Sequence, residues 1–469
     1  MEQAFGVRTD RRPSDFTKIE PRGQVLWGVT GTGRDVLRVG GGRFAAQLPY
    51  YLEHNQLQNT GLTLTDVTLT GSAVPTPDFP QYRANPAAIP GIPTGTAAPP
   101  SYVNVVSPDF RTPSVWKGSA AYQRRITPWL ALTGTVLGSR TTQNYTYYDL
   151  NLRATPAFTL DNEGGRGVFV PASTITAARV TQNSNAWVTK TVGRTLELRS
   201  DGEARQIAGI AEAAVRLPRG ASLDVSYTRN RSRDNSSYGC CLARTMTTYT
   251  PVPSDPRDLS GSWGPSDVDF KHKVVVAGTL TSVAGFRLSG RYVGSTGRPF
   301  SAVVNGDINS DEANGNDLAF VFNPDDPPTP ADVAASMRKV LNNPGNVARD
   351  YLRANLGRIA TRNGATVPWT GRLDLRLARA VPTARGQRIE ITADVFNAAN
   401  LFSRKWGSQD LLPAGISDQN PVTQRVPLLN IVGFDQVTRR YTYTVNQNFG
   451  VLTRGGDPYQ IQLGARYAF

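Results

Sequence analysis

Cysteine, histidine and methionine are scarce in this chain of 469 residues, and long hydrophobic runs are absent. The two cysteines, Cys240 and Cys241, are adjacent, and the two histidines, His54 and His272, lie far from them in the sequence. Such a set cannot supply the ligands of a tetrahedral zinc site. No segment approaches about eighteen consecutive apolar residues, so a helical membrane span is excluded. The cysteine pair is compatible with a strained disulfide or with two thiols.

Catalytic signatures are also missing. The chain contains no GxSxG, no HExxH and no glycine-rich phosphate loop, which are short motifs of serine hydrolases, zinc proteases and nucleotide-binding enzymes. A Ser-His-Asp site would have to use His54 or His272, and neither histidine lies in a recognisable catalytic context. The sequence therefore predicts that the protein is not an enzyme, and it offers no catalytic residues.

The net charge is +14. A positive surplus of this size attracts phosphate, so nucleic-acid binding is one interpretation. The arginines are scattered along the chain, however, and they form no compact basic helix or RNA-recognition motif. We therefore expect no nucleic-acid partner, and we interpret the arginines as the lining of a wet lumen or of its mouth.

The amino-terminal sequence has no apolar core of the kind that a secretory signal peptide needs. Residues 1–16 (MEQAFGVRTDRRPSDF) are mostly polar and charged. This observation is inconsistent with export of the chain as it stands. We therefore expect that the signal peptide is missing from this chain.

Glycine, proline and strand-favouring residues are abundant instead. The chain contains 44 Gly, 33 Pro and 17 Tyr together with many Thr and Val, which suits many strands joined by turns and long loops. Residues 459–469 (YQIQLGARYAF) alternate apolar and polar side chains. A strand with one apolar and one wet face needs this pattern, and about 9–11 tilted residues cross a bilayer core. The edge of a soluble β-sandwich is the alternative.

Charged residues on the second face of several strands discriminate between these alternatives. In residues 372–377 three leucines alternate with Arg372, Asp374 and Arg376, and residues 388–395 alternate in the same way. Charges on the inner face of nearly every strand would disrupt the dry core of a sandwich, whereas a water-filled or plugged lumen accepts them. The sequence therefore predicts an all-β fold, an antiparallel transmembrane β-barrel.

Eleven strands are predicted, with short turns on one side and long loops on the other, as in outer-membrane barrels whose long loops lie outside the cell. Bacterial single-chain barrels have even strand numbers, so the odd count indicates that at least one strand is missing from the front. We therefore expect a partial barrel, with residues 1–21 as the remnant of a preceding extracellular loop or strand and 22–469 as the carboxy-terminal half. The expected strands are 22–30, 34–46, 115–126, 129–140, 207–217, 221–231, 268–280, 284–295, 371–380, 387–397 and 459–469.

Two further elements are expected within the long loops, and loops of this length usually carry function. Residues 329–342 (TPADVAASMRKVLN) have helical spacing, which predicts a short helix in an external loop. Residues 428–446 (LLNIVGFDQVTRRYTYTVN) predict additional extended structure in the last external loop.

Several stretches resemble the barrel of TonB-dependent outer-membrane receptors, specifically the Oar-like group. They include IEPRGQVLWGV, STGRPFSAVVNGDINSDEANGNDLAF, IEITADVFNAANLFSRKWG and DPYQIQLGARYAF, and they run from about residue 20 to the end of the chain. Their order and spacing are specific when taken together. The resemblance implies a location in the cell outer membrane of the Gram-negative type. It also implies a barrel of about 22 strands with an amino-terminal plug and a TonB box.

The function that the resemblance implies is the uptake or surface binding of a large solute. The plug, the TonB box and the first half of the barrel have no counterpart in these residues. We therefore expect the TonB complex to act only through the missing amino-terminal part, so this segment is not independently active. Outer-membrane lipid and the barrel-assembly machinery are the other expected partners. Two alternatives stay open: a passive outer-membrane porin of smaller strand number, and a secreted all-β adhesin.

The densest cluster of oxygen ligands lies in residues 307–317 (DINSDEANGND). Its first, third and fifth residues have the alternate spacing that begins a Ca²⁺-binding EF-hand loop. The pattern departs at position six, which is Glu312 rather than Gly, and at position twelve, which is Leu318 rather than Glu. A loop of Asx turns that satisfies its own backbone is the alternative. The candidate Ca²⁺ ligands are Asp307, Asn309, Asp311, Asn316 and Asp317, and we expect no other cofactor.

The carboxy-terminal strand carries a second candidate site. Its apolar face ends on an aromatic residue, which resembles the terminal signal that the barrel-assembly machinery reads. Plain lipid-facing residues are the alternative. The candidate signal residues are Ile461, Leu463, Tyr467 and Phe469. The sequence identifies no substrate-binding residues, because specificity is expected in the irregular external loops and in the plug.

Overall fold

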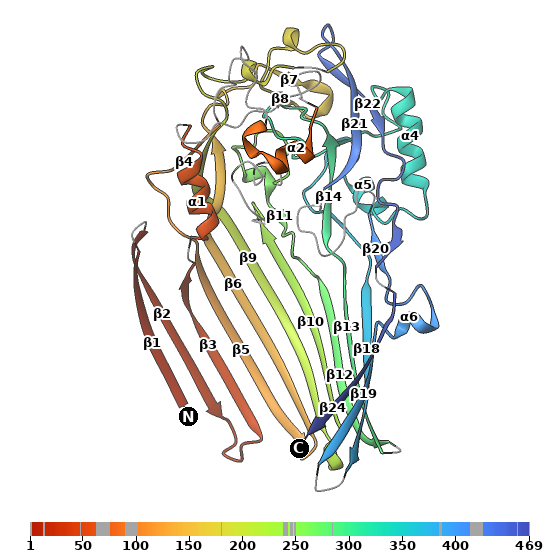
Figure 1. The fold of residues 1–469 in the computed structure, drawn as a ribbon. Coiled ribbons are helices and arrows are strands. Elements are labelled where there is room, and N and C mark those ends of the chain that lie inside the picture. Colours follow the sequence, from red (N-terminus) through yellow and green to blue (C-terminus); the bar gives the residue numbers. More distant parts are fainter. Residues whose placement is uncertain are drawn as a thin grey trace.

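A large curved β-sheet dominates the protein, and its long connections gather at one end (Figure 1). Both ends of the chain lie near the opposite end of the sheet (Figure 1). The computed structural model describes residues 2–12, 15–46, 48–61, 76–89, 102–179, 181–237, 243, 247, 250–283, 285–383, 387–412, 425–456 and 458–468.

Twelve strands follow one another across the main sheet in the order of the sequence, and each pairs antiparallel with the next. They are β1 (Glu2–Arg12), β2 (Asp15–Gly28), β3 (Asp35–Ala45), β5 (Ser114–Thr127), β6 (Leu130–Asp149), β9 (Thr195–Arg216), β10 (Ser222–Asp234), β12 (His272–Val283), β13 (Phe286–Ser295), β18 (Thr370–Pro382), β19 (Arg388–Phe396) and β24 (Gln460–Ala468). Two short strands, β4 (Val103–Val106) and β11 (Gly264–Pro265), add to β9 and β10, which makes a 14-stranded sheet. The sequential order is that of an up-and-down barrel wall.

The number of strands in this wall differs from the predicted eleven. Residues 2–12 form β1, which pairs with β2 along most of its length. The sequence of β1 gives a weak hydrophobic signal, because Arg8, Asp10 and Arg12 interrupt its alternation. The predicted odd number was therefore wrong, and the argument for a missing strand that rested on it no longer applies. Residues 1–21, expected as a remnant of a loop or strand, include β1 and the first part of β2.

The register of the wall gives it one apolar and one polar face. Leu375 lies opposite Val395, which in turn lies opposite Ile461. On the other face Arg376 lies opposite Asp394, and their side chains form an ion pair of 3.5 Å. Because side chains alternate along a strand, each of these rows continues onto the neighbouring strands. The predicted division into an apolar face and a charged face is confirmed.

The apolar face is exposed rather than packed. The side chains of Val136, Ile391 and Leu463 are 57%, 54% and 78% exposed. A water-soluble protein rarely exposes so extended an apolar surface, whereas in a barrel wall such side chains meet hydrocarbon. Figure 1 shows the wall below the loops as a single layer, unlike the two stacked sheets of a sandwich.

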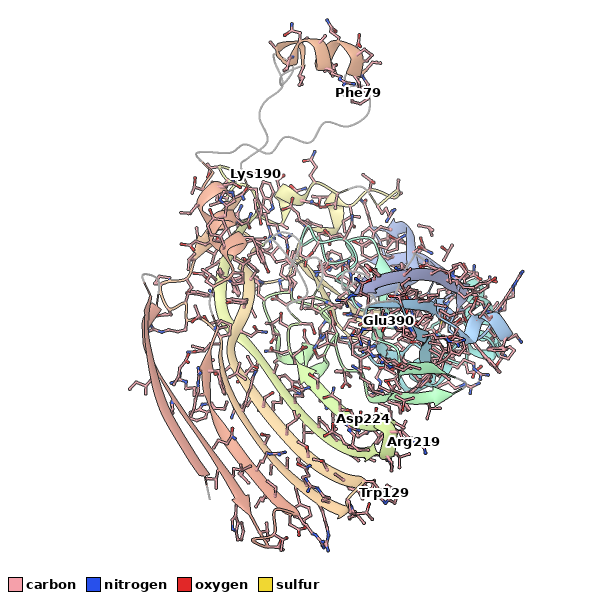
Figure 2. All side chains as sticks on the ribbon, turned by 60° about the horizontal axis from the view of Figure 1, so that its bottom comes forward. Phe79, Trp129, Lys190, Arg219, Asp224 and Glu390 are labelled. Carbon is pink, nitrogen blue, oxygen red and sulfur yellow. The ribbon has the colours of Figure 1, made fainter. Side chains whose placement is uncertain are left out.

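From β2 to β24, short turns join the strands at one end of the wall, and long connections join them at the other. Figure 2 shows Trp129 and Arg219 at the end with the short turns, and Lys190 at the opposite end. The longest strands, β6 and β9, contain 20 and 22 residues. At about 3.3 Å per residue they are longer than a bilayer core of about 30 Å. They therefore continue beyond the bilayer into the region of the long connections.

The wall is open at its two lateral edges. Within the described residues β1 pairs only with β2, β24 pairs only with β19, and no bridge joins β1 to β24. Figure 1 shows the two edge strands on different sides of the wall. The described strands thus form a partial barrel, as the sequence predicted.

The long connections contain smaller sheets and short helices. A four-stranded sheet has the order β17-β14-β21-β22, and three two-stranded sheets pair β15 with β16, β20 with β23, and β7 with β8. These strands are β7 (Phe158–Leu160), β8 (Arg166–Val168), β14 (Pro299–Asn305), β15 (Phe320–Val321), β16 (Arg358–Ile359), β17 (Ala365–Thr366), β20 (Gln409–Leu411), β21 (Arg425–Asp435), β22 (Arg440–Val445) and β23 (Thr453–Gly455). The helices are α1 (Tyr50–Gln58), α2 (Phe79–Ala84), α4 (Ala331–Asn342), α5 (Arg349–Ala354) and α6 (Ala399–Phe402). None of the helices in the described residues is long and apolar enough to span a bilayer.

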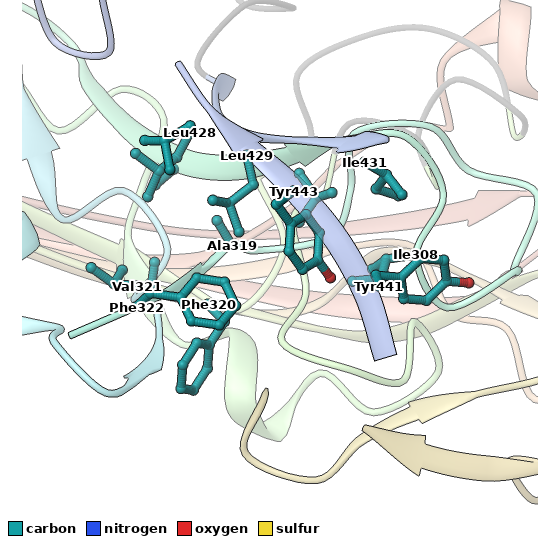
Figure 3. Packing of buried hydrophobic residues seen from close by; sticks show 14 of the residues in the cluster. Ile308, Ala319, Phe320, Val321, Phe322, Leu428, Leu429, Ile431, Tyr441 and Tyr443 are labelled. Carbon is teal, nitrogen blue, oxygen red and sulfur yellow. The ribbon is translucent and has the colours of Figure 1, made fainter. Parts of the chain in front are cut away.

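A buried hydrophobic core holds the loop elements together. Phe300 of β14 is fully buried. Leu428 and Leu429 of β21 are also fully buried, and Tyr443 of β22 packs in the same cluster (Figure 3). Helix α4 contributes Met337, which is also fully buried. The predicted helix is confirmed, because its buried residues recur at helical spacing. The predicted extended structure is confirmed as β21 and β22.

Candidate functional site

The long connections pack into one unit that we call the loop domain, defined as the described residues of 152–186, 299–367 and 425–449. Strand β14 leads into residues 306–317, which we call the acidic loop. The main-chain amide of Val304 donates to the carbonyl of Asp317 at 2.9 Å, so the two ends of the acidic loop are joined. The loop is thereby fixed on the core sheet of the loop domain.

Carboxylate and amide side chains of the acidic loop accept hydrogen bonds from its own backbone. The two oxygens of Asp307 accept from the amides of Asp311, at 3.1 Å, and Glu312, at 2.9 Å. Asn309 Oδ1 accepts from the amide of Asp311 at 3.0 Å, and Asp311 Oδ1 accepts from the amide of Ala313 at 2.8 Å. The Asx turns expected as an alternative are therefore present. They hold the first three candidate ligands in defined orientations.

Two non-glycine residues of the acidic loop have left-handed backbone conformations. The φ angles are 63° at Ser310 and 68° at Glu312. Such conformations cost about 1–3 kcal/mol each, and they persist only where the surrounding structure fixes them. Glu312 stands at position six, where an EF-hand loop has glycine for its sharp turn. Although Glu312 replaces the glycine of the EF-hand pattern, its backbone still makes the turn.

Arg166, which the sequence did not single out, lies fully buried beside the acidic loop. Its guanidinium is 3.5 Å from Asp317 Oδ1 and 3.6 Å from Glu163 Oε2, and it donates to the carbonyl of Leu318. The hydroxyl of Tyr443 donates to Glu163 from β22. A buried guanidinium needs such acceptors to offset its desolvation. The network joins β8, the acidic loop and β22.

Burial perturbs the carboxyl groups of the acidic loop. Desolvation, reinforced by the negative charges of Asp311 and Asp317, raises the pKa of Asp307 well above its usual range. Desolvation also raises the pKa of Asp317 to about 8, although Arg166 opposes the shift. The pKa of Asp311 is raised by desolvation against the attraction of Arg194. Burial thus favours the protonated, uncharged forms of these carboxyl groups, and the neighbouring arginines do not fully offset this effect.

A polar cavity of 590 Å³ opens beside the acidic loop. Asp307 and Glu312 line one part of it, and Arg179, Asn183 and Tyr441 come from neighbouring segments. Carboxylates, a guanidinium and amides are polar groups that fix the orientation of a ligand. Both a hydrated cation and a polar part of a solute fit an opening of this size and polarity.

A second buried polar cluster joins the loop domain to the wall. Arg362 donates to the carboxylate of Asp234, at the end of β10, and to the carbonyl of Ser262 at 2.8 Å. Its neighbour Asn363 donates to Asp267 Oδ1 at 2.6 Å. Desolvation raises the pKa of Asp267 to about 6, although Arg362 and Asn363 oppose the shift. No local sequence pattern marks this cluster, because its members are about a hundred residues apart.

The polar face of the wall contains a hollow of 730 Å³. Arg22 and Lys117 lie over the ring of Phe44, at 4.4 Å and 5.5 Å from its centroid. Gly40 and Gly118 also line the hollow and contribute no side chains to fill it. The positively charged lining that the sequence predicted for the lumen is present here.

All five candidate Ca²⁺ ligands lie in the acidic loop, where hydrogen bonds link Asp307, Asn309 and Asn316 to Asp311. The carboxylate of Asp317 faces Arg166 instead. Within the described residues no group of three or more His, Cys, Asp or Glu side chains is arranged to hold a metal ion. This finding does not test a site that uses two carboxylates with amide and carbonyl oxygens, so the Ca²⁺ site stays a prediction. Cys240 and Cys241 lie outside the described residues.

The candidate assembly signal lies at the other end of the molecule from the acidic loop. Ile461, Leu463 and Tyr467 are on the apolar face of β24, and each side chain is more than half exposed. Phe469 lies outside the described residues. The exposure fits both an assembly signal and plain lipid contact, so the signal stays a prediction.

A single-layered antiparallel wall with an apolar outer face, a polar inner face and long loops at one end defines an outer-membrane β-barrel. The sequence profile of the outer membrane beta barrel domain matches residues 3–462. The chain therefore belongs to this family, and it is located in the cell outer membrane, as predicted. No curated protein sequence matches the chain significantly.

Solved structures of outer-membrane transporters and receptors resemble the fold. The outer-membrane transporter YddB from Escherichia coli superposes with a TM-score of 0.50 at 10% identity, over 99% of this chain and 43% of that one. The ferric enterobactin receptor PfeA from Pseudomonas aeruginosa gives 0.43 at 8% identity, over 99% and 42%. The FrpB iron transporter from Neisseria meningitidis gives 0.38 at 8% identity, over 96% and 39%. The likeness to YddB shows the fold, and the expected resemblance to the barrel of an outer-membrane receptor is confirmed at that level, whereas TonB dependence and the Oar-like group stay predictions. The chain spans less than half the length of these structures.

Proposed function

We propose that this chain forms part of the wall and the external binding domain of a TonB-dependent transporter, which takes up or binds a large solute. The family and the fold support transport across the outer membrane at the coarse level. The finer proposal rests on the packed loop domain at the external end of the wall. A passive porin needs only an open, polar lumen, whereas a receptor needs a rigid surface above it.

The loop domain offers such a surface. Its core is as dry as that of a soluble protein, since Phe300, Leu352 and Leu428 are all fully buried. The polar cavity that contains Asp307 and Glu312 opens from this core. Loops that serve only as connections would not need to bury so many apolar side chains. This folded external domain is the observation that carries the proposal.

The open edges of the wall supply the second part of the proposal. An unpaired edge strand leaves backbone donors and acceptors without partners, and hydrocarbon does not tolerate them. We therefore propose that strands other than the twelve of this wall pair with β1 and β24. We further propose that the plug and the TonB box act together with those strands, and that the barrel-assembly machinery inserts the complete barrel. Lipid then contacts only the apolar face.

Native purification tests this proposal. The protein is extracted in mild detergent from outer membranes of the bacterium that produces it, together with whatever it binds, and passed over immobilised periplasmic domain of TonB. The proposal predicts retention on this column and no steady ion conductance of the preparation in planar bilayers. Failure to bind TonB together with a steady open conductance would instead identify a passive porin.

A cross-linking experiment tests the open edges separately. A photoreactive amino acid replaces Gln462 on the free edge strand β24. The expected cross-link is to a strand outside β1–β19. A product that joins β24 to β1 of the same chain would show a wall sealed by these residues alone, which contradicts the proposal. The same replacement at Asp394 of the paired strand β19 is the control, and it should cross-link within the wall.

A further inference from the structure

We propose that the acidic loop binds one Ca²⁺ ion, with Asp307, Asn309 and Asp311 as side-chain ligands and Asn316 as an additional oxygen ligand. This inference does not depend on the transport function, because it concerns the folding of the external loop domain. It goes beyond the spacing of the residues, since that spacing departs from an EF-hand at two positions. Five structural observations, given below, carry it.

The first observation is the path of the backbone. An EF-hand loop takes ligands from positions one, three and five, then a main-chain carbonyl at position seven. Asp307, Asn309 and Asp311 hold the first three positions, and the amide of Ala313, at position seven, donates to Asp311. The sharp turn at position six is present although the residue is Glu312. The loop therefore follows the backbone path of the first part of an EF-hand loop.

The second observation is independent of the loop conformation. Asn316 is fully buried, and its side-chain nitrogen donates to Asp311 Oδ2 at 2.8 Å. Its oxygen Oδ1 is buried and has no hydrogen-bond partner within the described residues. A buried amide oxygen without a partner costs about 1–3 kcal/mol. A cation bound at Asn316 Oδ1 would supply the missing partner, and Asn oxygens are normal Ca²⁺ ligands.

The third observation is the balance of charge. Asp307 forms no ion pair within the described residues, while Asp311 and Asp317 lie close enough to repel it. Three guanidinium groups lie nearby: Arg179 lines the same cavity as Asp307, and Arg194 attracts both Asp311 and Asp149. Arg166 contacts Asp317, and Arg194 lies 3.2 Å from Asp149. Unpaired buried carboxylates are costly unless they pair or coordinate a metal. A divalent cation would compensate Asp307 and Asp311 together.

The fourth observation is access. Asp307 and Glu312 line the polar cavity of 590 Å³, so a hydrated ion reaches the loop from the external medium. Ca²⁺ retains water readily within its six to eight oxygen ligands. The cavity therefore provides both the route and the space for water ligands that the protein does not supply.

The fifth observation assigns a different part to Asp317. Its oxygens accept from the amide of Ile308, at 3.0 Å, and face Arg166 at 3.5 Å. These contacts orient it toward the core of the loop domain. Asp317 is therefore a positioning residue that fixes the start of the acidic loop, and not one of the side-chain ligands proposed here.

Binding is measured on the full chain, purified in detergent from outer membranes, with Tb³⁺ as the probe and Ca²⁺ as the competitor. The side chain of Trp187 lies beside that of Glu312, so tryptophan excitation should sensitise bound Tb³⁺. We expect luminescence that Ca²⁺ displaces with a Kd in the range of about 10⁻⁴–10⁻³ M, which is usual for extracellular Ca²⁺ modules. The unfolding temperature (Tm) of the loop domain should rise by several degrees when Ca²⁺ is added and fall again when EDTA removes it.

Two variants with opposite effects make the test specific. Asp311→Asn keeps the shape of the side chain but removes its charge, so Ca²⁺ affinity should fall at least tenfold. Asn316→Asp adds a charge beside Asp311, so it should lower the Tm in EDTA and raise Ca²⁺ affinity several-fold. The exposed Asp326→Asn is the matched control, and it should bind like the unchanged protein.

Three results would overturn the site. The first is an unchanged protein whose Tm and Tb³⁺ luminescence do not respond to Ca²⁺. The second is equal Ca²⁺ affinity in Asp311→Asn and Asp326→Asn. The third is an Asn316→Asp variant that loses stability without gaining affinity, which would show a loop of self-satisfied Asx turns. If Asp311→Asn does not fold, the Asn316→Asp variant alone decides between these outcomes.

Discussion

The wall and the loop domain use apolar side chains in opposite ways. On the wall they point outward, and Leu463 is 78% exposed. In the loop domain they point inward, and Phe300 and Leu428 have no exposed area. The difference arises from the solvent, because lipid surrounds the wall whereas water surrounds the loops. Apolar side chains are therefore exposed in one region of the chain and buried in the other. The two longest strands, β6 and β9, extend from the wall into the region of the loops.

The charged residues complete this comparison. On the wall, pairs such as Arg376 and Asp394 lie on the polar face, at 51% and 18% side-chain exposure. In the loop domain, Arg166 and Asp317 are paired with no exposure at all. A partly exposed pair contributes little to stability, whereas removal of one partner from a buried pair is costly. Buried polar networks therefore stabilise the fold of the loop domain, whereas the charged pairs of the wall form its hydrated inner surface.

The largest effect is expected in the core of the loop domain. Phe300→Ala should lower the free energy of unfolding of this domain by about 3–5 kcal/mol, because it opens a cavity in a fully buried position. The exposed Phe402→Ala should change it by about 0.5 kcal/mol or less. Protease resistance of the external loops as a function of urea measures both. Equal losses from the two variants would mean that the loops have no dry core of their own.

A charge on the lipid face should have the next largest effect. Val136→Arg should disfavour insertion by about 2–4 kcal/mol, the cost of arginine near the middle of a bilayer. The adjacent Thr135→Arg points to the polar face and should be nearly neutral. The yield of folded, heat-modifiable protein in outer-membrane vesicles measures the difference. A lower yield for Thr135→Arg than for Val136→Arg would show that Thr135, and not Val136, faces the lipid.

The buried cluster that joins the two regions should respond to pH. The pKa of Asp267 in the folded protein is about 6, above a value of about 3.9 for an unfolded chain. Between these values the folded state binds more protons, so this group adds stability as the pH falls from 7 to about 4. The full effect is on the order of 2–3 kcal/mol.

Asp267→Asn should remove this component of the pH dependence. Melting curves of the loop domain between pH 7 and pH 4.5 should show a weaker gain on acidification in the variant than in the unchanged protein. Asp326→Asn, on the exposed surface, should keep the original profile. Parallel profiles for all three proteins would show that Asp267 is already compensated at neutral pH.

The smallest of these effects concerns a single hydroxyl group. Tyr443→Phe removes the donor to the buried carboxylate of Glu163 and should destabilise the loop domain by about 1–2 kcal/mol. Tyr459→Phe, at an exposed position before β24, should be neutral. Urea-dependent protease resistance again provides the measurement. A neutral Tyr443→Phe would mean that Arg166 alone satisfies Glu163.

The wall could be predicted from sequence because its signal is local. Alternation with a period of two is visible within a few residues, as in residues 372–377, and it fixes both the strand and its faces. Strand β1 was missed because Arg8, Asp10 and Arg12 interrupt that alternation, and its place depends on pairing with β2. Helix α4 was predicted for the same local reason, since its buried residues recur at helical spacing.

The loop domain could be predicted only in pieces, because its contacts are distant in the sequence. Arg166 meets Asp317, and Tyr443 meets Glu163, across more than a hundred intervening residues. The spacing of Asp307, Asn309 and Asp311 marked the acidic loop. No local pattern marks Arg166 as the cation beside it. Pairwise contacts of this kind require the folded chain.

Accessibility along β6 tests the central claim most directly. Spin labels are placed one at a time at residues 131–138, in a protein whose two native cysteines are replaced by serine, and the protein is studied in outer-membrane vesicles. A barrel wall predicts accessibility that alternates with a period of two residues. Oxygen dissolved in the lipid should reach positions 132, 134 and 136, and a water-soluble nickel complex should reach 133, 135 and 137. If the nickel complex reached neither the odd-numbered nor the even-numbered positions, as in the dry core of a sandwich, the proposed barrel wall would be contradicted.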